Sequence, residues 1–340
     1  MMEEQLLSYP QNTVCFRDQH PLKRGTWPGE NRILTGLACL SMLVIVSACN
    51  QLTPAQKAQQ QLAAAREDGK RGKTAEAIIE YRKALQADPS LATAHFELGQ
   101  LYINAGDYLN GTRQMTAAIE LDGANSAARL GLADIFLLAR NYTDAKTQAD
   151  EVLSRHSGDP AALLVLAKSH AGLGQGGDAQ ADVLQVLKLQ PANADAWLLQ
   201  AGLQFQANNF TASEHSFRQA IEHDPSQVAA VAAFTVLLLQ QHRDGEAERV
   251  IRECVSKNPN NASAQYVLAA FLWQEKRLPE AESAFKSLAA LGQADPQQRA
   301  ALANFYVSTR RFDLAEKEYS EIVAKHKDDM FNRSALASLY

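Results

Sequence analysis

The feature that most constrains this chain is a period of 34 residues that runs from about Ala58 to the last residue. Proline marks the period, because Pro191, Pro225 and Pro259 are spaced 34 residues apart and Pro89 lies three periods before Pro191. A fixed spacing held over that length predicts an array of packed repeats rather than two independently folded domains joined by a linker.

Numbering each repeat so that this proline falls at position 32 makes repeat 1 begin at residue 58 and shows which positions are small. Position 8 is Ala65, Gly99, Ala133, Ala167, Ala201, Thr235, Ala269, Ala303 and Ala337; position 20 is Ala77, Gly111, Ala145, Ala179, Ser213, Ala247, Ala281 and Ala315. Two small positions allow two helices of one repeat to approach closely, and the apolar positions share one face at helical spacing. The proline stops the second helix, because its ring clashes with a continuing turn.

Two further positions are apolar in almost every repeat and predict the packing between helix pairs. Position 24 is Tyr81, Met115, Ala149, Val183, Phe217, Ile251, Phe285 and Tyr319, and position 27 is Ala84, Ala118, Val152, Val186, Ala220, Cys254, Leu288 and Ile322. A single helix pair cannot bury such a face, so we expect the pairs to stack into a rod.

This pattern resembles the tetratricopeptide repeat (TPR) family, whose loose consensus places Trp, Leu, Gly, Tyr, Ala, Phe, Ala and Pro at such offsets. The segment AHFELGQLYINAGDY at 94–108 is the nearest copy, and Trp197 occupies the family's tryptophan offset. The resemblance covers 58–340 without insertion or deletion: eight full repeats, 58–329, and part of a ninth. It implies an all-α fold, a right-handed α-solenoid of antiparallel helix pairs.

The residues before the repeats indicate export. Ile33–Val46 is a mostly apolar run of fourteen residues, flanked by Lys23, Arg24 and Arg32. A membrane-spanning helix needs roughly 20 apolar residues, whereas the core of a secretory signal is shorter and follows basic residues. The thirty residues before Arg32 do not fit a signal peptide, and a start codon assigned too far upstream would explain them.

Cys49 ends this segment in the sequence Val46-Ser47-Ala48-Cys49, which resembles the lipobox of bacterial lipoproteins, with Val46 where leucine is more usual. The resemblance implies lipidation of Cys49 after cleavage, and the alternatives are a plain signal peptide or an uncut anchor. We therefore expect an extension with a signal peptide at 1–48, a tether at 49–57 and the solenoid at 58–340. By the family rule, Asn50 rather than aspartate favours the outer membrane, with the chain facing the periplasm.

Few sequence features suggest chemistry. GLGQGG at 172–177 fits a dinucleotide motif by letter, but a predicted helix precedes it, so we interpret it as a turn between helices. The eight histidines form no metal-binding spacing, and His95 and His170 fall at offsets where the family has aromatic residues, which predicts packing roles. Cys254 is the one cysteine after Cys49 and is expected to fill the core rather than to react. We predict no cofactor and no metal.

A protein-binding groove is the function that the family resemblance implies, lined by the first helix of each repeat through positions 2, 5, 9 and 12. The predicted groove residues are Phe96, Leu130, Leu164, Lys168, Leu198, Phe205, Tyr266 and Trp273. The lysine and asparagine set by which one branch of the family holds a chain terminus is missing. The groove is thus predicted to take an amphipathic helix or an extended apolar segment, although any one of these residues could instead contact the next repeat.

Two classes of function follow from these observations. The first is a non-catalytic scaffold, lipid-anchored in the cell envelope, that binds other proteins in an assembly or export system; by analogy, the chain looks like TPR lipoproteins of exopolysaccharide or PEP-CTERM systems, or of pilus assembly. The second is the substrate-recognition arm of an enzyme whose catalytic part lies elsewhere. The net charge of −5 and the lack of a basic stripe argue against nucleic acid as a partner.

Overall fold

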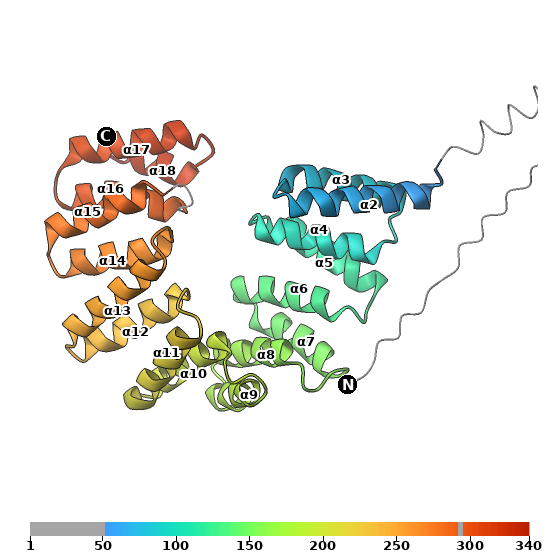
Figure 1. Ribbon diagram of the computed structural model, residues 1–340, viewed down its shortest axis with the longest axis horizontal. Helices are drawn as coiled ribbons and strands as arrows, with labels where there is room; N and C mark the ends of the chain where they lie inside the picture. Colours follow the sequence, from blue (N-terminus) through green and yellow to red (C-terminus); the bar gives the residue numbers. More distant parts are fainter. Residues whose placement is uncertain (1–51, 292–294, 340) are drawn as a thin grey trace, which may run out of the picture. The chain divides into compact units, whose positions relative to one another are not determined.

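The computed structural model describes residues 52–291 and 295–339. Within those ranges every regular element is an α-helix, and the helices follow one another in pairs (Figure 1). The predicted signal peptide and lipidation site, including Cys49, lie outside the described residues. In the part that is described, no helix combines the length and apolar character needed to cross a membrane.

The helices repeat at the predicted interval. First helices begin 34 residues apart from α4 to α18, and second helices do so from α3 to α17, so the 34-residue period and the all-α repeat solenoid are confirmed. The first helices are α2 (Pro54–Lys70), α4 (Ala92–Asn104), α6 (Ser126–Leu138), α8 (Pro160–Gly172), α10 (Ala194–Gln206), α12 (Val228–Gln240), α14 (Ala262–Gln274), α16 (Pro296–Ser308) and α18 (Met330–Ala337). The second helices are α3 (Thr74–Ala87), α5 (Tyr108–Leu121), α7 (Tyr142–Leu153), α9 (Gly176–Leu189), α11 (Phe210–His223), α13 (Asp244–Lys257), α15 (Leu278–Ala289) and α17 (Phe312–Lys325).

The start of α2 differs from the predicted boundary at residue 58, because the helix already begins at Pro54. Thr53 and Gln56 form the reciprocal bonds of a capping box: the Gln56 amide donates to Thr53 Oγ1 at 3.2 Å, and the Thr53 amide donates to Gln56 Oε1 at 2.9 Å. Proline is also well suited to the first turn of a helix. Four residues of the predicted tether are therefore helical.

The small positions lie where the two helices of a repeat meet. From Ala65 to Ala315, the residues at positions 8 and 20 are all buried, whereas Ala337 is exposed. A side chain at Gly111 would place its Cβ 2.8 Å from Ile103 Cγ1 on the partner helix. In repeat 5, the Ser213 hydroxyl at position 20 donates to the carbonyl of Ala201 at position 8 over 2.9 Å. Close helix approach at these positions is thus confirmed.

The turn inside each repeat needs one residue in the left-handed region, always at position 15. Glycine fills it in repeats 1, 2 and 4, at Gly72, Gly106 and Gly174. Side-chain-bearing residues fill it in the other full repeats, where this conformation is sterically costly; these are Arg140, Asn208, His242, Lys276 and Arg310, with φ between 57° and 59°.

A recurring hydrogen bond joins consecutive repeats. The side chain at position 4 of a first helix bonds to the carbonyl at position 32 of the preceding repeat. It links Trp197 to Pro191 at 2.7 Å and Gln265 to Pro259 at 3.1 Å, and His95 Nε2 lies 3.2 Å from the Pro89 carbonyl. His95 is therefore a hydrogen-bonding residue at the repeat junction as well as a half-buried packing residue.

The apolar core is organised differently in the two halves of the array. In repeats 1 to 4 it consists of separate clusters, such as Met115, Ala118, Ala128 and Leu132 between α5 and α6. From repeat 5 onward, a large cluster runs from Ala201 to Ala315 and contains Phe217, Phe234, Phe285 and Phe305, and a small separate cluster of Ala300, Ala303 and Tyr319 follows at the end of the array. The C-terminal repeats thus share a continuous core.

Charged side chains connect the C-terminal repeats in the same regular way. Position 16 is arginine in repeats 6, 7 and 8, and each arginine bonds to the glutamate at position 21 of the preceding second helix. The distances are 2.6 Å for Arg243–Glu214, 2.7 Å for Arg277–Glu248 and 2.7 Å for Arg311–Glu282. Hydrogen bonds from basic side chains lower the pKa of two of these glutamates to about 2. For Glu214 the bond from Arg243 has the largest effect, and for Glu282 the bond from Lys286 has the largest effect, followed by that from Arg311.

Candidate partner-binding face

The predicted groove residues lie on the first helices but differ in exposure. Tyr266 is 40% exposed, and Lys168 is half-buried with its Nζ 3.4 Å from Asp195 Oδ2. The rest are half-buried and pack against core clusters; they are Phe96, Leu130, Leu164, Leu198, Phe205 and Trp273. Tyr266 is therefore the most exposed apolar member of the predicted set.

The character of this first-helix face changes along the array at position 9. Repeats 1 to 4 carry polar residues there, Arg66, Gln100, Asp134 and Lys168. Repeats 5 to 7 carry Gly202, Val236 and Ala270, and the Val236 side chain is 51% exposed. The face is thus charged over the N-terminal repeats and apolar over repeats 5 to 7.

The charged part is largely neutralised by its own pairs. Arg66 donates three hydrogen bonds to Glu97, from Nη2 to Oε1 at 2.7 Å and from Nε to Oε2 at 2.9 Å and Oε1 at 3.0 Å. Tyr81 donates to the same carboxylate at 3.0 Å. Burial and the nearby Glu97 charge raise the pKa of Tyr81 to about 12. Partial burial among the first helices raises the pKa of Asp134, and the Lys168 charge opposes that shift.

The apolar part contains a cavity of about 280 Å³ between the first helices of repeats 7, 8 and 9. The Trp273 ring forms one wall and lies edge-on to both Phe285 and Phe305, with centroid distances of 5.9 Å. Trp273 therefore packs against repeat 8 while also facing the cavity. The lining residues are Tyr266, Ala270, Trp273, Phe285, Gln297, Ala301, Asn304 and Phe331.

Asn304 gives this cavity a polar group of defined direction. The Tyr319 hydroxyl donates to Asn304 Oδ1, which fixes the orientation of the amide. The Asn304 Nδ2 group is then the free end, and it can donate to a carbonyl placed in the cavity. The site combines aromatic walls with a directed hydrogen-bond donor, which is typical of a pocket that takes an apolar side chain beside a peptide backbone.

Tyr266 and Trp273, both predicted groove residues, line this cavity from α14, whereas most of the residues opposite them are not among the predicted groove residues. Gln297, Asn304 and Phe331 occupy positions 2, 9 and 2 of the next two repeats, which are groove positions of the family. These groove positions could therefore have been recognised in the sequence, but only by considering the positions of three consecutive repeats together.

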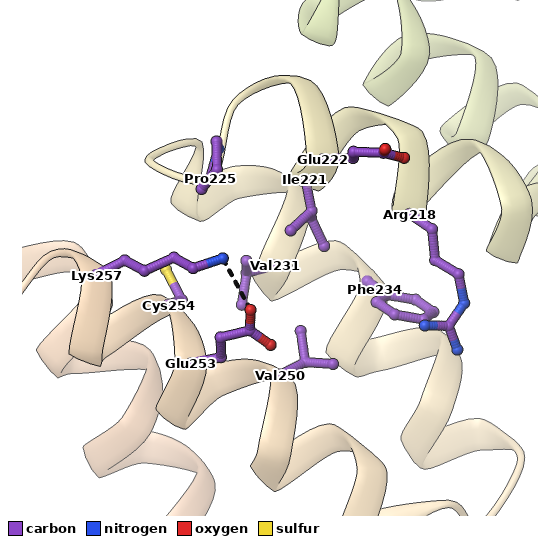
Figure 2. A pocket seen from close by; sticks show the side chains of 10 residues that line it. All are labelled: Arg218, Ile221, Glu222, Pro225, Val231, Phe234, Val250, Glu253, Cys254 and Lys257. Carbon is purple, nitrogen blue, oxygen red and sulfur yellow. Dashed lines mark hydrogen bonds and ion pairs between the residues drawn. The ribbon is translucent and has the colours of Figure 1, made fainter.

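A second cavity, of about 360 Å³, opens among α11, α12 and α13 (Figure 2). Its floor is apolar and includes Phe234 and Cys254, while its rim charges are engaged: Lys257 bonds Glu253 at 2.8 Å, and the Arg218 guanidinium lies 5.0 Å from the Phe234 ring centre. Burial raises the pKa of the Cys254 thiol, which disfavours the reactive thiolate. The core role of Cys254 is confirmed, and the charges of Arg218, Glu253 and Lys257 at the rim already have charged or aromatic partners, while Glu222 accepts a hydrogen bond from Gln219.

The other sequence motifs lie in structural positions. GLGQGG falls at the turn between α8 and α9, where Gly174 has φ +75°, and the Tyr142 ring occupies the space of a Cβ at Gly172. His170 Nδ1 lies 2.7 Å from Asp182 Oδ2, so this histidine bonds within its repeat. Among the described residues, no three His, Cys, Asp or Glu side chains are grouped so that they could hold a metal ion.

Comparison with family models agrees with this geometry. One tetratricopeptide repeat model matches residues 102–160 and 164–228, a second matches 238–305, and a TPR repeat model matches 66–106. The chain belongs to the tetratricopeptide repeat family. A search of curated protein sequences finds no match.

Several solved structures share the fold. Yeast Tom70 is 16% identical with a TM-score of 0.57, and the match covers 81% of this chain and 59% of Tom70. PilW, a type IV pilus biogenesis factor, is 16% identical with a TM-score of 0.54, over 63% of this chain and 99% of PilW. Pseudomonas aeruginosa PilF is 15% identical with a TM-score of 0.50, and the match covers 64% of this chain and 99% of PilF. At these identities the likeness is one of fold.

Proposed function

We propose that this chain is a non-catalytic scaffold that binds a partner protein through its first-helix face. The observation that carries the proposal is the cavity at Tyr266 and Trp273, because an exposed tyrosine, a tryptophan edge and a directed amide donor converge there. Aromatic residues of this kind dominate the energetics of protein interfaces.

The partner segment is apolar or helical. A 280 Å³ cavity with aromatic walls accepts one large apolar side chain, and the adjoining Val236 and Ala270 extend the apolar surface along the array. Asn304 donates a hydrogen bond to a backbone carbonyl of that segment, which would fix its direction. An amphipathic helix laid along a groove and an extended strand both satisfy these requirements.

We also propose that the scaffold is lipid-anchored at Cys49 and faces the periplasm from the outer membrane, as part of a cell-envelope assembly or export system. The lipobox-like sequence before Cys49 and the residue after it, Asn50, support this placement. PilW, which shares the fold, is a type IV pilus biogenesis factor. That setting is proposed by analogy.

The binding proposal is tested by placing a photo-crosslinking amino acid at position 266 in cells and identifying the captured protein from native membranes. Tyr108 provides a matched control, because it is a tyrosine of similar exposure, 44%, at the start of a second helix. A discrete product at 266 that is absent at 108 supports the face, and identical products at both positions contradict it.

Affinity for the identified partner then separates binding from packing. Tyr266→Ala should weaken affinity by about 2 kcal/mol with an unchanged melting temperature. Trp273→Ala should lower both the affinity and the melting temperature, since the Trp273 ring packs on Phe285 and Phe305. A Trp273→Ala protein that melts earlier but binds with full affinity would remove Trp273 from the site.

The anchor is tested separately by palmitate labelling and detergent partition. The processed wild-type chain should begin at Cys49 and incorporate labelled palmitate. The Cys49→Ser chain should be released from the membrane or misprocessed. A mature chain that begins elsewhere and needs no detergent would contradict lipidation.

A further inference from the structure

Gln200 breaks the pattern of a buried position. It occupies position 7 of α10, where every repeat from the second to the ninth otherwise has leucine or phenylalanine: Leu98, Leu132, Leu166, Phe234, Leu268, Leu302 and Leu336. Gln200 is only 5% exposed, and its Oε1 is a buried acceptor with no hydrogen-bond partner in the part of the chain that the structure describes.

Position 7 faces the second helix of the preceding repeat. In repeat 4, for example, Leu166 packs in one cluster with Ala145 and Ala149 of α7. By the same register, Gln200 lies at the junction between α9 and α10, which joins repeats 4 and 5. An unsatisfied amide at this place weakens the junction, because it replaces apolar contact and adds the desolvation cost of a carbonyl oxygen.

The apolar core divides at the same helix. Ala196 and Leu203 of α10 belong to a cluster with α8 and α9, whereas Ala201 belongs to the continuous cluster that extends to α17. The neighbouring buried polar side chains of Ser169, Asp182, Ser213 and Ser216 all have hydrogen-bond partners, so the unsatisfied acceptor of Gln200 is the feature that distinguishes this point. Similar unsatisfied acceptors occur at Gln61 and Asn332, in the first and ninth repeats, and at Gln227 at the end of repeat 5.

We propose that the junction between repeats 4 and 5 is a built-in joint, at which the block of repeats 5 to 8 moves relative to repeats 1 to 4. In a repeat array the stability of each junction counts separately, so the array opens first at its weakest interior junction. The joint lies where the charged part of the first-helix face gives way to the apolar part. Movement there changes the separation of the two parts, and a partner that contacts both holds the joint in one setting.

The joint is tested by distance measurements between spin labels in a chain whose native cysteines are replaced by serine. Labels at Ser154 and Glu222 span repeats 3 to 5 and cross the joint. Labels at Ser256 and Ala324 occupy the same repeat position in repeats 6 and 8 and form the matched control; all four sites are exposed. The distance distribution of the first pair should be clearly broader than that of the control pair.

Substitution at position 7 then assigns the effect to Gln200. Gln200→Leu restores the residue that most repeats use, and it should narrow the Ser154–Glu222 distribution to the control width and slow hydrogen exchange in α9 and α10 by about tenfold. The reciprocal change, Leu302→Gln, should broaden the Ser256–Ala324 pair. Equal widths for the two wild-type pairs, or a broad first pair that Gln200→Leu leaves unchanged, would overturn the proposal.

Discussion

The residue at position 16, in the turn within a repeat, has different roles along the molecule. At position 16 of repeats 2, 3 and 5, the Asp107, Asn141 and Asn209 side chains accept hydrogen bonds from the first turn of their own second helices. At the same position in repeats 6 and 7, Arg243 and Arg277 reach back to the preceding second helix. One position thus serves as a helix cap in repeats 2, 3 and 5 and as an inter-repeat link from repeat 6 onward.

The apolar cores of the two halves of the array also differ, in how far each cluster extends. Small clusters in repeats 1 to 4 each join one helix pair to the next first helix, whereas aromatic residues in repeats 5 to 8 form one continuous cluster. Strong coupling between neighbours makes repeats unfold together, and weak coupling lets them open separately. We therefore expect repeats 5 to 8 to behave as one cooperative block, which presents the proposed binding cavity on a rigid support.

The largest expected effect comes from removing an aromatic side chain of that block. Phe305 is fully buried and contacts Phe285, Trp273 and Tyr306, so Phe305→Ala should cost about 3–5 kcal/mol of stability. Its effect on hydrogen exchange should spread over α13 to α17. Met115→Ala, at an equally buried site in repeat 2, should raise exchange only in α4 to α6. Equally local effects for both variants would remove the distinction between the halves.

Overpacking should be next in size. Ala281→Leu and Ala167→Leu enlarge fully buried positions where paired helices meet, and each should destabilise by about 1–3 kcal/mol in urea titrations. Lys146→Leu is the control, since Lys146 is only half-buried and its ammonium pairs with Asp150 of its own helix. Equal shifts at all three sites would show that the assignment of the small positions is wrong.

Acid should weaken the C-terminal block through the inter-repeat carboxylates. The folded pKa of Glu214 and Glu282 is about 2, below the unfolded value of about 4.3. A lowered pKa gives stability that is fully present above the unfolded value and is lost as the pH falls toward 2. Glu214→Gln should therefore cost about 1 kcal/mol at pH 7 and almost nothing near pH 2, because the inter-repeat bond from Arg243 is the main cause of the low Glu214 pKa.

The matched control for that pH series is Glu80→Gln in the N-terminal half. Glu80 pairs with Lys83 of the same helix, so it links no repeats. Urea midpoints for both variants between pH 7 and pH 2 provide the test. A pH-independent difference between wild type and Glu214→Gln would exclude the inter-repeat ion pairs as its source.

The smallest expected effect concerns the left-handed residue of the turn. Lys276→Gly should stabilise by about 0.5 kcal/mol, because the cost of a left-handed lysine slightly exceeds the entropy cost of glycine. Gly106→Ala should instead destabilise by roughly 1 kcal/mol at the same position of repeat 2. Thermal melts of both variants measure the difference, and a destabilised Lys276→Gly would mean that the lysine side chain makes a stabilising contact.

The repeat frame could be predicted from the sequence because it depends on local rules. Proline at position 32 and small residues at positions 8 and 20 each constrain one helix end or one helix pair, and the helices begin at the implied interval. The Thr53 and Gln56 residues of the capping box are also a sequence signal for a helix start, in a segment that was predicted to be a tether.

The site and the inter-repeat links were harder to predict, because they depend on contacts across repeats. Arg277 and Glu248 are 29 residues apart, and only the packed second helices bring them to 2.7 Å. The direction of the Trp273 ring depends on Phe305 in the next repeat. Gln200 could be recognised as an exception at position 7, but its burial without a partner became evident only in the folded chain.

Native-state hydrogen exchange along the whole chain tests the central claim most directly. A uniform repeat array frays from its ends and is most protected in the middle. In this chain we instead expect a common, high protection across α13 to α15, a minimum at α9 and α10, and separate, lower values for the helices of repeats 1 to 3. Protection that peaks at α9 and α10 and falls smoothly toward both ends would contradict it.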